Sequence, residues 1–171
     1  MHLCGLHRSE DRVIVGIAEL AVSSNPQVTL MTYSLGSCLG VAIYDPAVRV
    51  GGLLHLMLPD SKIDPVKGAA RPGMFVDTGI PALFRGAYNL GADKRRLLIY
   101  VAGGAQVMDD SGYFSIGKRN YEALTALLNR HGLRICAEQV GGFKNRTLCL
   151  NLRSGDVSLR ISGQTKEVPL C

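Results

Sequence analysis

Cys38 and His55 are the two side chains whose types and spacing point to covalent chemistry. A cysteine thiolate is a nucleophile, and a neighbouring imidazole can activate it and later protonate a leaving group. Asp45-Pro46, between them, has the signature of a type I turn and predicts a β-hairpin. If the hairpin is centred on the Pro46–Ala47 peptide bond, the cysteine and the histidine lie directly opposite, with Cβ atoms about 4.5 to 5.5 Å apart. The sequence therefore predicts a Cys–His pair held by two adjacent strands.

The turn before the cysteine offers backbone donors. Gly36 and Ser37 directly precede Cys38, and their N–H groups would favour a thiolate and stabilise a tetrahedral oxyanion. The histidine also needs an acceptor that orients its ring. Four nearby side chains qualify by position: Thr29, Thr32, Ser34 and Asp45. Spacing alone does not choose among them.

A cysteine in a Gly-Ser turn has an alternative role as a small buried residue. The other histidines are less suited to catalysis, because His2 and His7 lie near the N-terminus and His131 ends a predicted helix. Cys136 and Cys149 lie within apolar stretches, which predicts core packing. Since no C-x-x-C pair or phosphate-binding glycine motif occurs, we expect neither a disulfide framework, nor a metal, nor a nucleotide cofactor.

The composition is that of a globular protein. Of 171 residues, 47% are apolar and 19% are charged, which excludes intrinsic disorder. No apolar run is long enough to span a membrane and the N-terminus does not resemble a signal peptide, so we expect a cytoplasmic protein without membrane insertion. The net charge is +5, but the basic residues are dispersed and tryptophan is absent, which argues against nucleic-acid binding. An acidic protein partner would suit this charge.

Apolar periodicity predicts a mixed α/β domain of layered sheets with two main helices. Strands are expected at 13–17, 19–22, 28–33, 39–44, 51–58, 96–101, 133–140, 146–152 and 157–161, and helices at 76–90 and 115–130. Residues 61–73 contain two prolines and two glycines without apolar periodicity, which predicts a surface loop and a candidate lid. Residues 1–11 are expected to be a flexible leader, and 12–171 a single domain.

Several segments together resemble one protein family, the bacterial CheD chemoreceptor glutamine deamidases. The similarity runs from about Val15 to Ile161. The matching segments are Leu35-Gly-Ser-Cys38, Tyr44-Asp-Pro46, Gly51-Gly-Leu-Leu-His55-Leu-Met-Leu-Pro59, Asp77-Thr78, Gly103-Gly104-Ala105, Ile116-Gly-Lys-Arg-Asn120 and Gly141-Gly142.

The resemblance implies Cys38 as nucleophile, His55 as general base and acid, and Thr32 as the group that orients the histidine. The implied reaction converts receptor glutamine to glutamate through a thioester, releases ammonia and needs no cofactor. The family is also similar in fold to the deamidase domain of the cytotoxic necrotizing factor toxins. The implied partners are the cytoplasmic domains of chemoreceptors and a CheC-type phosphatase.

The sequence departs from the family pattern in two places, after Gly103-Gly104 at Gln106–Asp109 and after Gly141-Gly142 at Phe143–Arg146. We expect both segments to affect the choice of partner more than the chemistry. Two other functions remain open on the sequence. The first is a non-catalytic regulator that binds either receptors or a partner phosphatase. The second is a thiol amidase or esterase that acts on another substrate.

Overall fold

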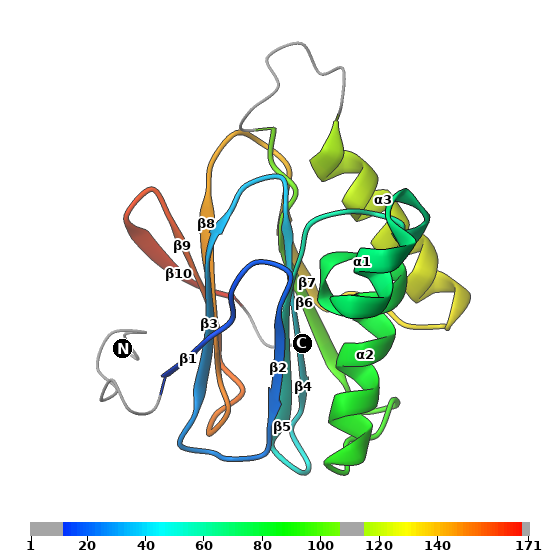
Figure 1. Ribbon diagram of the computed structural model, residues 1–171. Helices are drawn as coiled ribbons and strands as arrows, with labels where there is room; N and C mark the ends of the chain where they lie inside the picture. Colours follow the sequence, from blue (N-terminus) through cyan, green and yellow to red (C-terminus); the bar gives the residue numbers. More distant parts are fainter. Residues whose placement is uncertain (1–11, 107–114, 169–171) are drawn as a thin grey trace.

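Two five-stranded β-sheets lie face to face, and helices cover the outer face of one of them (Figure 1). The computed structural model describes residues 12–106 and 115–168, so the predicted leader lies outside the described residues. The first sheet has the order β1 (Arg12–Ile14), β3 (Thr29–Leu35), β8 (Arg146–Asn151), β9 (Val157–Ile161), β10 (Gln164–Val168). The second has the order β2 (Leu20–Ser23), β5 (Val50–Leu56), β4 (Leu39–Asp45), β6 (Leu98–Gly103), β7 (Ala137–Val140).

Both sheets mix parallel and antiparallel pairs. The pairs β1–β3 and β6–β7 are parallel, and the others are antiparallel. The mixed α/β layered fold expected from the sequence is therefore confirmed.

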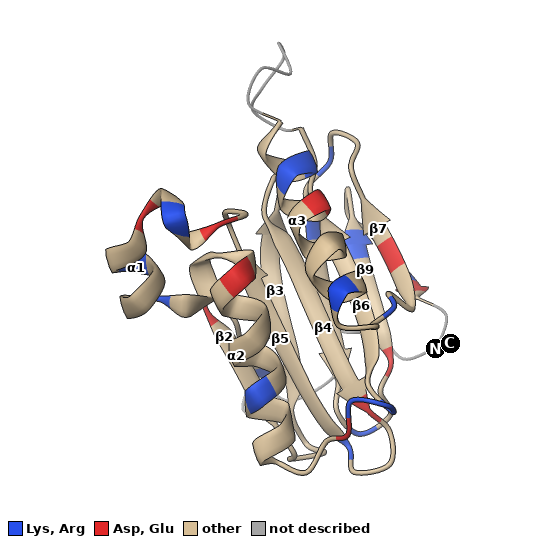
Figure 2. Cartoon of the chain, turned by 90° about the vertical axis from the view of Figure 1, so that its right-hand side faces the viewer, with Lys and Arg blue, Asp and Glu red and all other residues tan. Residues whose placement is uncertain are grey.

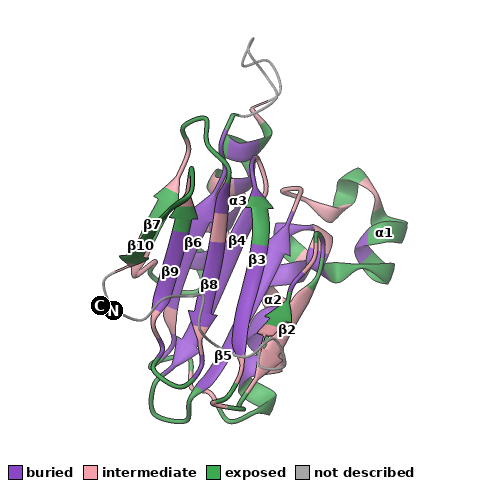
Figure 3. Cartoon of the chain, turned by 90° about the vertical axis from the view of Figure 1, so that its left-hand side faces the viewer, coloured by how far each residue is buried: buried purple, intermediate pink, exposed green. Residues whose placement is uncertain are grey.

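The two main helices are also as predicted. They are α2 (Val76–Asn89) and α3 (Ile116–Arg130), and each buries one apolar face. The second sheet consequently has two covered faces, and every residue of β4 and β5 is buried (Figure 3). One apolar cluster fills the space between this sheet and the helices, and another fills the space between the two sheets.

The predicted surface loop at 61–73 is instead a series of short helical turns. They are η2 (Ser61–Ile63), α1 (Pro65–Ala70) and η3 (Pro72–Met74). Asp60 and Asp64 accept backbone N–H bonds at the starts of η2 and α1, while the backbone N and Oγ of Ser61 donate to Asp77 at 2.9 and 2.6 Å. The prediction of an irregular loop is wrong because side-chain caps stabilise helical turns that have no apolar period.

Two strand predictions are also inaccurate at the C-terminal end of the sequence. Of the predicted strand at 133–140, only the four residues of β7 pair with a neighbour. The strand β10 was not expected, because its sequence is polar and mostly exposed. It forms an edge hairpin with β9, where no apolar face is needed.

Candidate active site

The hairpin that carries Cys38 and His55 has a different register from the one predicted. Asp45 pairs with Val50, so the loop spans residues 46–49 and His55 lies opposite Gly40. The prediction of a directly opposed Cys38–His55 pair is wrong, because the turn is centred one residue later than the Pro46–Ala47 peptide. The pairing changes by two residues, and side chains alternate between the faces of a strand. Cys38, directly before β4, therefore remains on the same side of the sheet as His55. Cys38 is the diagonal neighbour of His55, with about 7 to 8 Å between their Cα atoms.

The cysteine loop is fastened by three successive carbonyl groups. The Gly36 carbonyl accepts from Ala105 N at 2.8 Å, and the Cys38 carbonyl accepts from Gly104 N at 2.9 Å. Between them, the Ser37 carbonyl accepts from the Asn120 side chain at 3.1 Å. With all three carbonyls engaged by protein groups, the loop has a fixed conformation where the chain crosses from β3 in one sheet to β4 in the other (Figure 1).

Two glycines allow this close approach. Gly103 and Gly104 have φ values of +114° and +64°, which favour glycine. A Cβ on Gly103 would collide with the Cys38 carbonyl oxygen, and one on Gly117 would lie 2.5 Å from the Gly104 carbonyl. The glycine pair therefore lets β6 and the first turn of α3 reach the cysteine loop.

Thr32 contacts the histidine from the facing sheet. Its Oγ1 lies 2.7 Å from the carbonyl of Val15 and 2.7 Å from His55 Nδ1, and both side chains are buried. The carbonyl only accepts, so the single hydroxyl proton is donated to it. Thr32 Oγ1 must then accept from His55 Nδ1–H, which leaves the lone pair of the neutral imidazole on Nε2.

The environment of the pair favours the uncharged forms of both groups. Burial raises the pKa of the Cys38 thiol, with a partial offset from its own backbone N–H. Burial lowers the pKa of His55. His55 Nε2 is buried and has no hydrogen-bond partner among the described residues. The resting pair is therefore a thiol and a neutral imidazole whose free nitrogen is available as a base.

The backbone donors of the turn differ from one another. Gly36 N donates to Ser34 O at 2.9 Å, so this N–H is already used. Within the described residues, the N–H groups of Ser37 and Cys38 donate to no oxygen acceptor. Those two N–H groups are the ones available to a ligand, and Gly36 supplies the turn.

Asn120 is a site residue whose role the sequence did not indicate, although it lies in a segment that matches the family. It is fully buried on α3, and its amide donates to Ser37 O and, at 2.8 Å, to Met57 O. It thereby joins the cysteine loop to the end of β5, which carries His55. A buried asparagine on the inner face of an amphipathic helix was the available signal.

We expect Asn120→Ala to loosen the link between the two halves of the site. Two part-buried carbonyls lose a donor, so the free energy of unfolding falls by about 2 kcal/mol and the turnover rate by roughly tenfold. Urea unfolding and a turnover assay measure the two effects. Asn129→Ala, at an exposed position of the same helix, is the matched control. An unchanged turnover rate in Asn120→Ala would show that this link does not matter for activity.

The cysteines of the described segments differ in redox state. Cys38 is a free thiol, whereas Cys136 and Cys149 are disulfide-bonded. Cys149 is buried and Cys136 packs against the apolar cluster between the sheets, so the prediction of core packing is confirmed, whereas the expectation of no disulfide framework is wrong. Cys38 remains the available thiol in the part of the chain that the structure describes.

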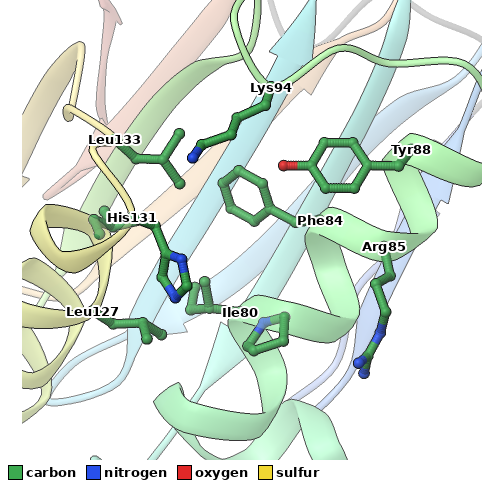
Figure 4. A pocket seen from close by; sticks show the side chains of 10 residues that line it. Ile80, Phe84, Arg85, Tyr88, Lys94, Leu127, His131 and Leu133 are labelled. Carbon is green, nitrogen blue, oxygen red and sulfur yellow. The ribbon is translucent and has the colours of Figure 1, made fainter.

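An apolar hollow of about 250 Å³ lies elsewhere, between α2 and α3 (Figure 4). Ile80, Phe84 and Leu127 line it, and its charged residues are Arg85 and Lys94. None of the candidate catalytic residues lines this hollow. In residues 12–106 and 115–168, no group of three or more His, Cys, Asp or Glu side chains is arranged to hold a metal. No helix of these segments has the length and apolar character needed to cross a membrane.

Comparison with known proteins identifies similar chains. The family model described as CheD chemotactic sensory transduction matches residues 57–161. A protein of Solibacter usitatus named probable chemoreceptor glutamine deamidase CheD is 48% identical over 158 residues, which cover 92% of this chain and 94% of that protein. A Syntrophus aciditrophicus protein named probable chemoreceptor glutamine deamidase CheD 1 is 48% identical over 88% of this chain and 94% of its own.

Among solved structures, there is a match to the crystal structure of the Neisseria meningitidis protein NMB0706, of the family model DUF152. The TM-score is 0.43 and the identity 10%, over 77% of this chain and 62% of that one.

Proposed function

The chain belongs to the CheD family, and on this premise we propose that it is a protein-glutamine deamidase that acts on bacterial chemoreceptors. It converts specific glutamine side chains to glutamate and releases ammonia. Its curated relatives are named as chemoreceptor glutamine deamidases. The structural observation that carries the assignment is the orientation of His55. Its Nδ1 is bound to Thr32, while its Nε2 is buried and has no partner in residues 12–106 and 115–168, on the side of the sheet that also carries a free thiol.

In the first half of the reaction, His55 Nε2 takes the proton of the Cys38 thiol as the sulfur attacks the amide carbon of glutamine. The negative charge on the amide oxygen is stabilised by the N–H groups of Ser37 and Cys38. His55 then protonates the amide nitrogen, the C–N bond breaks, and ammonia leaves a thioester on Cys38.

In the second half, His55 removes a proton from water, and the resulting hydroxide attacks the thioester carbon. The C–S bond breaks, the thiolate recovers a proton, and glutamate is released. The net change is one water consumed and one ammonia produced for each glutamine. The chain's own side chains supply every proton transfer, with Thr32 holding the imidazole in the required tautomer.

This function brings with it the other expectations from the family resemblance. The enzyme acts in the cytoplasm on the cytoplasmic helices of receptors, whose acidic residues suit a partner of net charge +5. A CheC-type phosphatase is a second partner. The fold is related to the deamidase domain of the cytotoxic necrotizing factor toxins.

Mass spectrometry of a receptor substrate tests the function directly. We expect the purified protein to add about one mass unit per modified glutamine to a cytoplasmic fragment of a chemoreceptor from the same genome. Ammonia should appear in equal amount.

A fragment in which the modified glutamines are replaced by glutamate should gain no mass. Release of methanol from a methyl-esterified fragment without ammonia would instead indicate an esterase. Binding of the fragment without any mass change would indicate a non-catalytic regulator.

A further inference from the structure

The loop 141–145 between β7 and β8 is a rigid extension of the candidate site. Gly141 N donates to Gly103 O at 2.9 Å, and Gln106 N donates to Gly142 O at 2.8 Å. Gly103 pairs with Leu39, the residue that follows the cysteine. The loop is therefore fastened to the same end of β6 that holds the cysteine loop.

Arg146 stabilises the loop 141–145 through hydrogen bonds from its side chain to carbonyls of the loop. Its side chain is buried, and its two terminal nitrogens donate to Gly141 O at 2.8 Å and Lys144 O at 3.1 Å. No carboxylate pairs with this guanidinium among the described residues, and burial lowers its pKa. An unpaired buried cation is costly, so its two bonds to loop carbonyls indicate that the loop conformation is strongly specified.

The loop presents an aromatic side chain to solvent. Phe143 is 76% exposed, although Gly141 and Gly142, with φ of +77° and +69°, and Arg146 fix the backbone around it. An exposed aromatic group on a fixed backbone is typical of binding hot spots, because little entropy is lost when it is covered.

Positively charged residues lie in this loop and in the first turn of α3. Lys144 is exposed in the loop, and Lys118 and Arg119 are exposed in the first turn of α3, at the same end of the molecule (Figure 2). This turn packs against Gly104, and Asn120 bonds Ser37 O, so the start of α3 borders the cysteine loop. Phe143 is thus an apolar anchor with cationic neighbours, which matches a helix that carries apolar and acidic residues.

On the basis of the proposed function, we propose that Phe143 is a specificity-determining residue that docks the substrate helix of the receptor. Two strand spacings separate Leu39 from Val140, and Phe143 follows closely, which places it about 10 to 15 Å from the thiol. A helix rises 1.5 Å per residue, so this span corresponds to about seven to ten residues. A substrate glutamine is therefore followed or preceded, two to three turns away, by an apolar side chain that contacts Phe143.

The test compares Phe143→Ala with Val48→Ala, an exposed apolar residue in the loop at the opposite end of β4. With the receptor fragment as substrate, we expect Phe143→Ala to raise KM by about tenfold to thirtyfold, with kcat within about twofold of wild type. The rate at which iodoacetamide alkylates Cys38, mapped by peptide mass, should not change. Val48→Ala should match wild type in both assays.

The possible results distinguish the docking role of Phe143 from the deamidase function. Wild-type KM in Phe143→Ala overturns the docking role and leaves the deamidase function intact. A parallel loss of deamidation and of Cys38 alkylation shows a structural role and also overturns it. If the wild type itself modifies no receptor glutamine, the proposed function fails. Binding of the receptor fragment to Cys38→Ala and to Phe143→Ala then tests the docking role separately. Equal affinity of the two variants for the fragment would overturn the docking role. Replacing the receptor's apolar residue by alanine should give no further loss in Phe143→Ala.

Discussion

Replacement of Cys38 by alanine abolishes deamidation of the receptor fragment, with an expected loss of at least about 10⁴-fold in kcat. The loss is this large because no other thiol of the described segments is free, and because the thioester route requires a sulfur at this position. Mass spectrometry of the fragment and ammonia release measure the loss.

The same variant should remain folded and should still bind receptor. Cys38 lies in a loop held by its backbone carbonyl, so removal of the sulfur leaves the hydrogen bond to Gly104 in place. We therefore expect an unfolding transition close to that of the wild type. Deamidation by Cys38→Ala at a rate comparable to wild type would exclude the thiol mechanism.

Local patterns in the sequence were sufficient to predict that the two candidate catalytic residues, Cys38 and His55, share one face of the hairpin. Alternating apolar residues fix that face, because a shift in register by two residues leaves the parity unchanged. They do not fix which residues are opposite. That depends on the turn, where Asp45 Oδ1 accepts from Ala47 N at 3.0 Å and Arg49 has φ of +54°. Because the turn is centred one residue later than predicted, Cys38 lies diagonal to His55 and not directly opposite it.

Contacts between distant segments could not be predicted in this way. The Asn120 bonds to Ser37 and Met57 join residues that are far apart in the chain, and no periodic pattern records them. The glycine pair 103–104 allows close approach of two backbones, and this contact also joins segments that are distant in the sequence. The choice of Thr32 among four candidate acceptors came from family resemblance. The structure adds the reason, since Thr32 faces His55 from the opposite sheet.

Burial also changes the chemical description of the pair. The backbone donors beside Cys38 predict a lowered thiol pKa, but partial burial raises the pKa of this thiol, and burial lowers the pKa of His55. In the proposed mechanism, the thiolate therefore forms during attack, when proton transfer to His55 Nε2 accompanies formation of the C–S bond. A protonated thiol is also less reactive toward oxidants and alkylating agents in the absence of substrate.

Thr32→Val should lower kcat by about 10² to 10³-fold, because the imidazole loses the acceptor that fixes its Nδ1–H tautomer. Thr32→Ser retains the hydroxyl and should retain most of the activity. The variant also leaves Val15 O without its donor, so a loss of stability alone must be distinguished from a loss of orientation.

The pH dependence of kcat/KM makes this distinction. The proposed mechanism requires neutral His55, and burial lowers the pKa of His55, so activity of the wild type should fall only below about pH 6.5. An acceptor at Nδ1–H stabilises the imidazolium more than the neutral ring, so its removal lowers the pKa further. We expect the acid limb to move to lower pH in Thr32→Val and to stay in place in Thr32→Ser. A lower rate with an unmoved acid limb would show that Thr32 acts through packing alone.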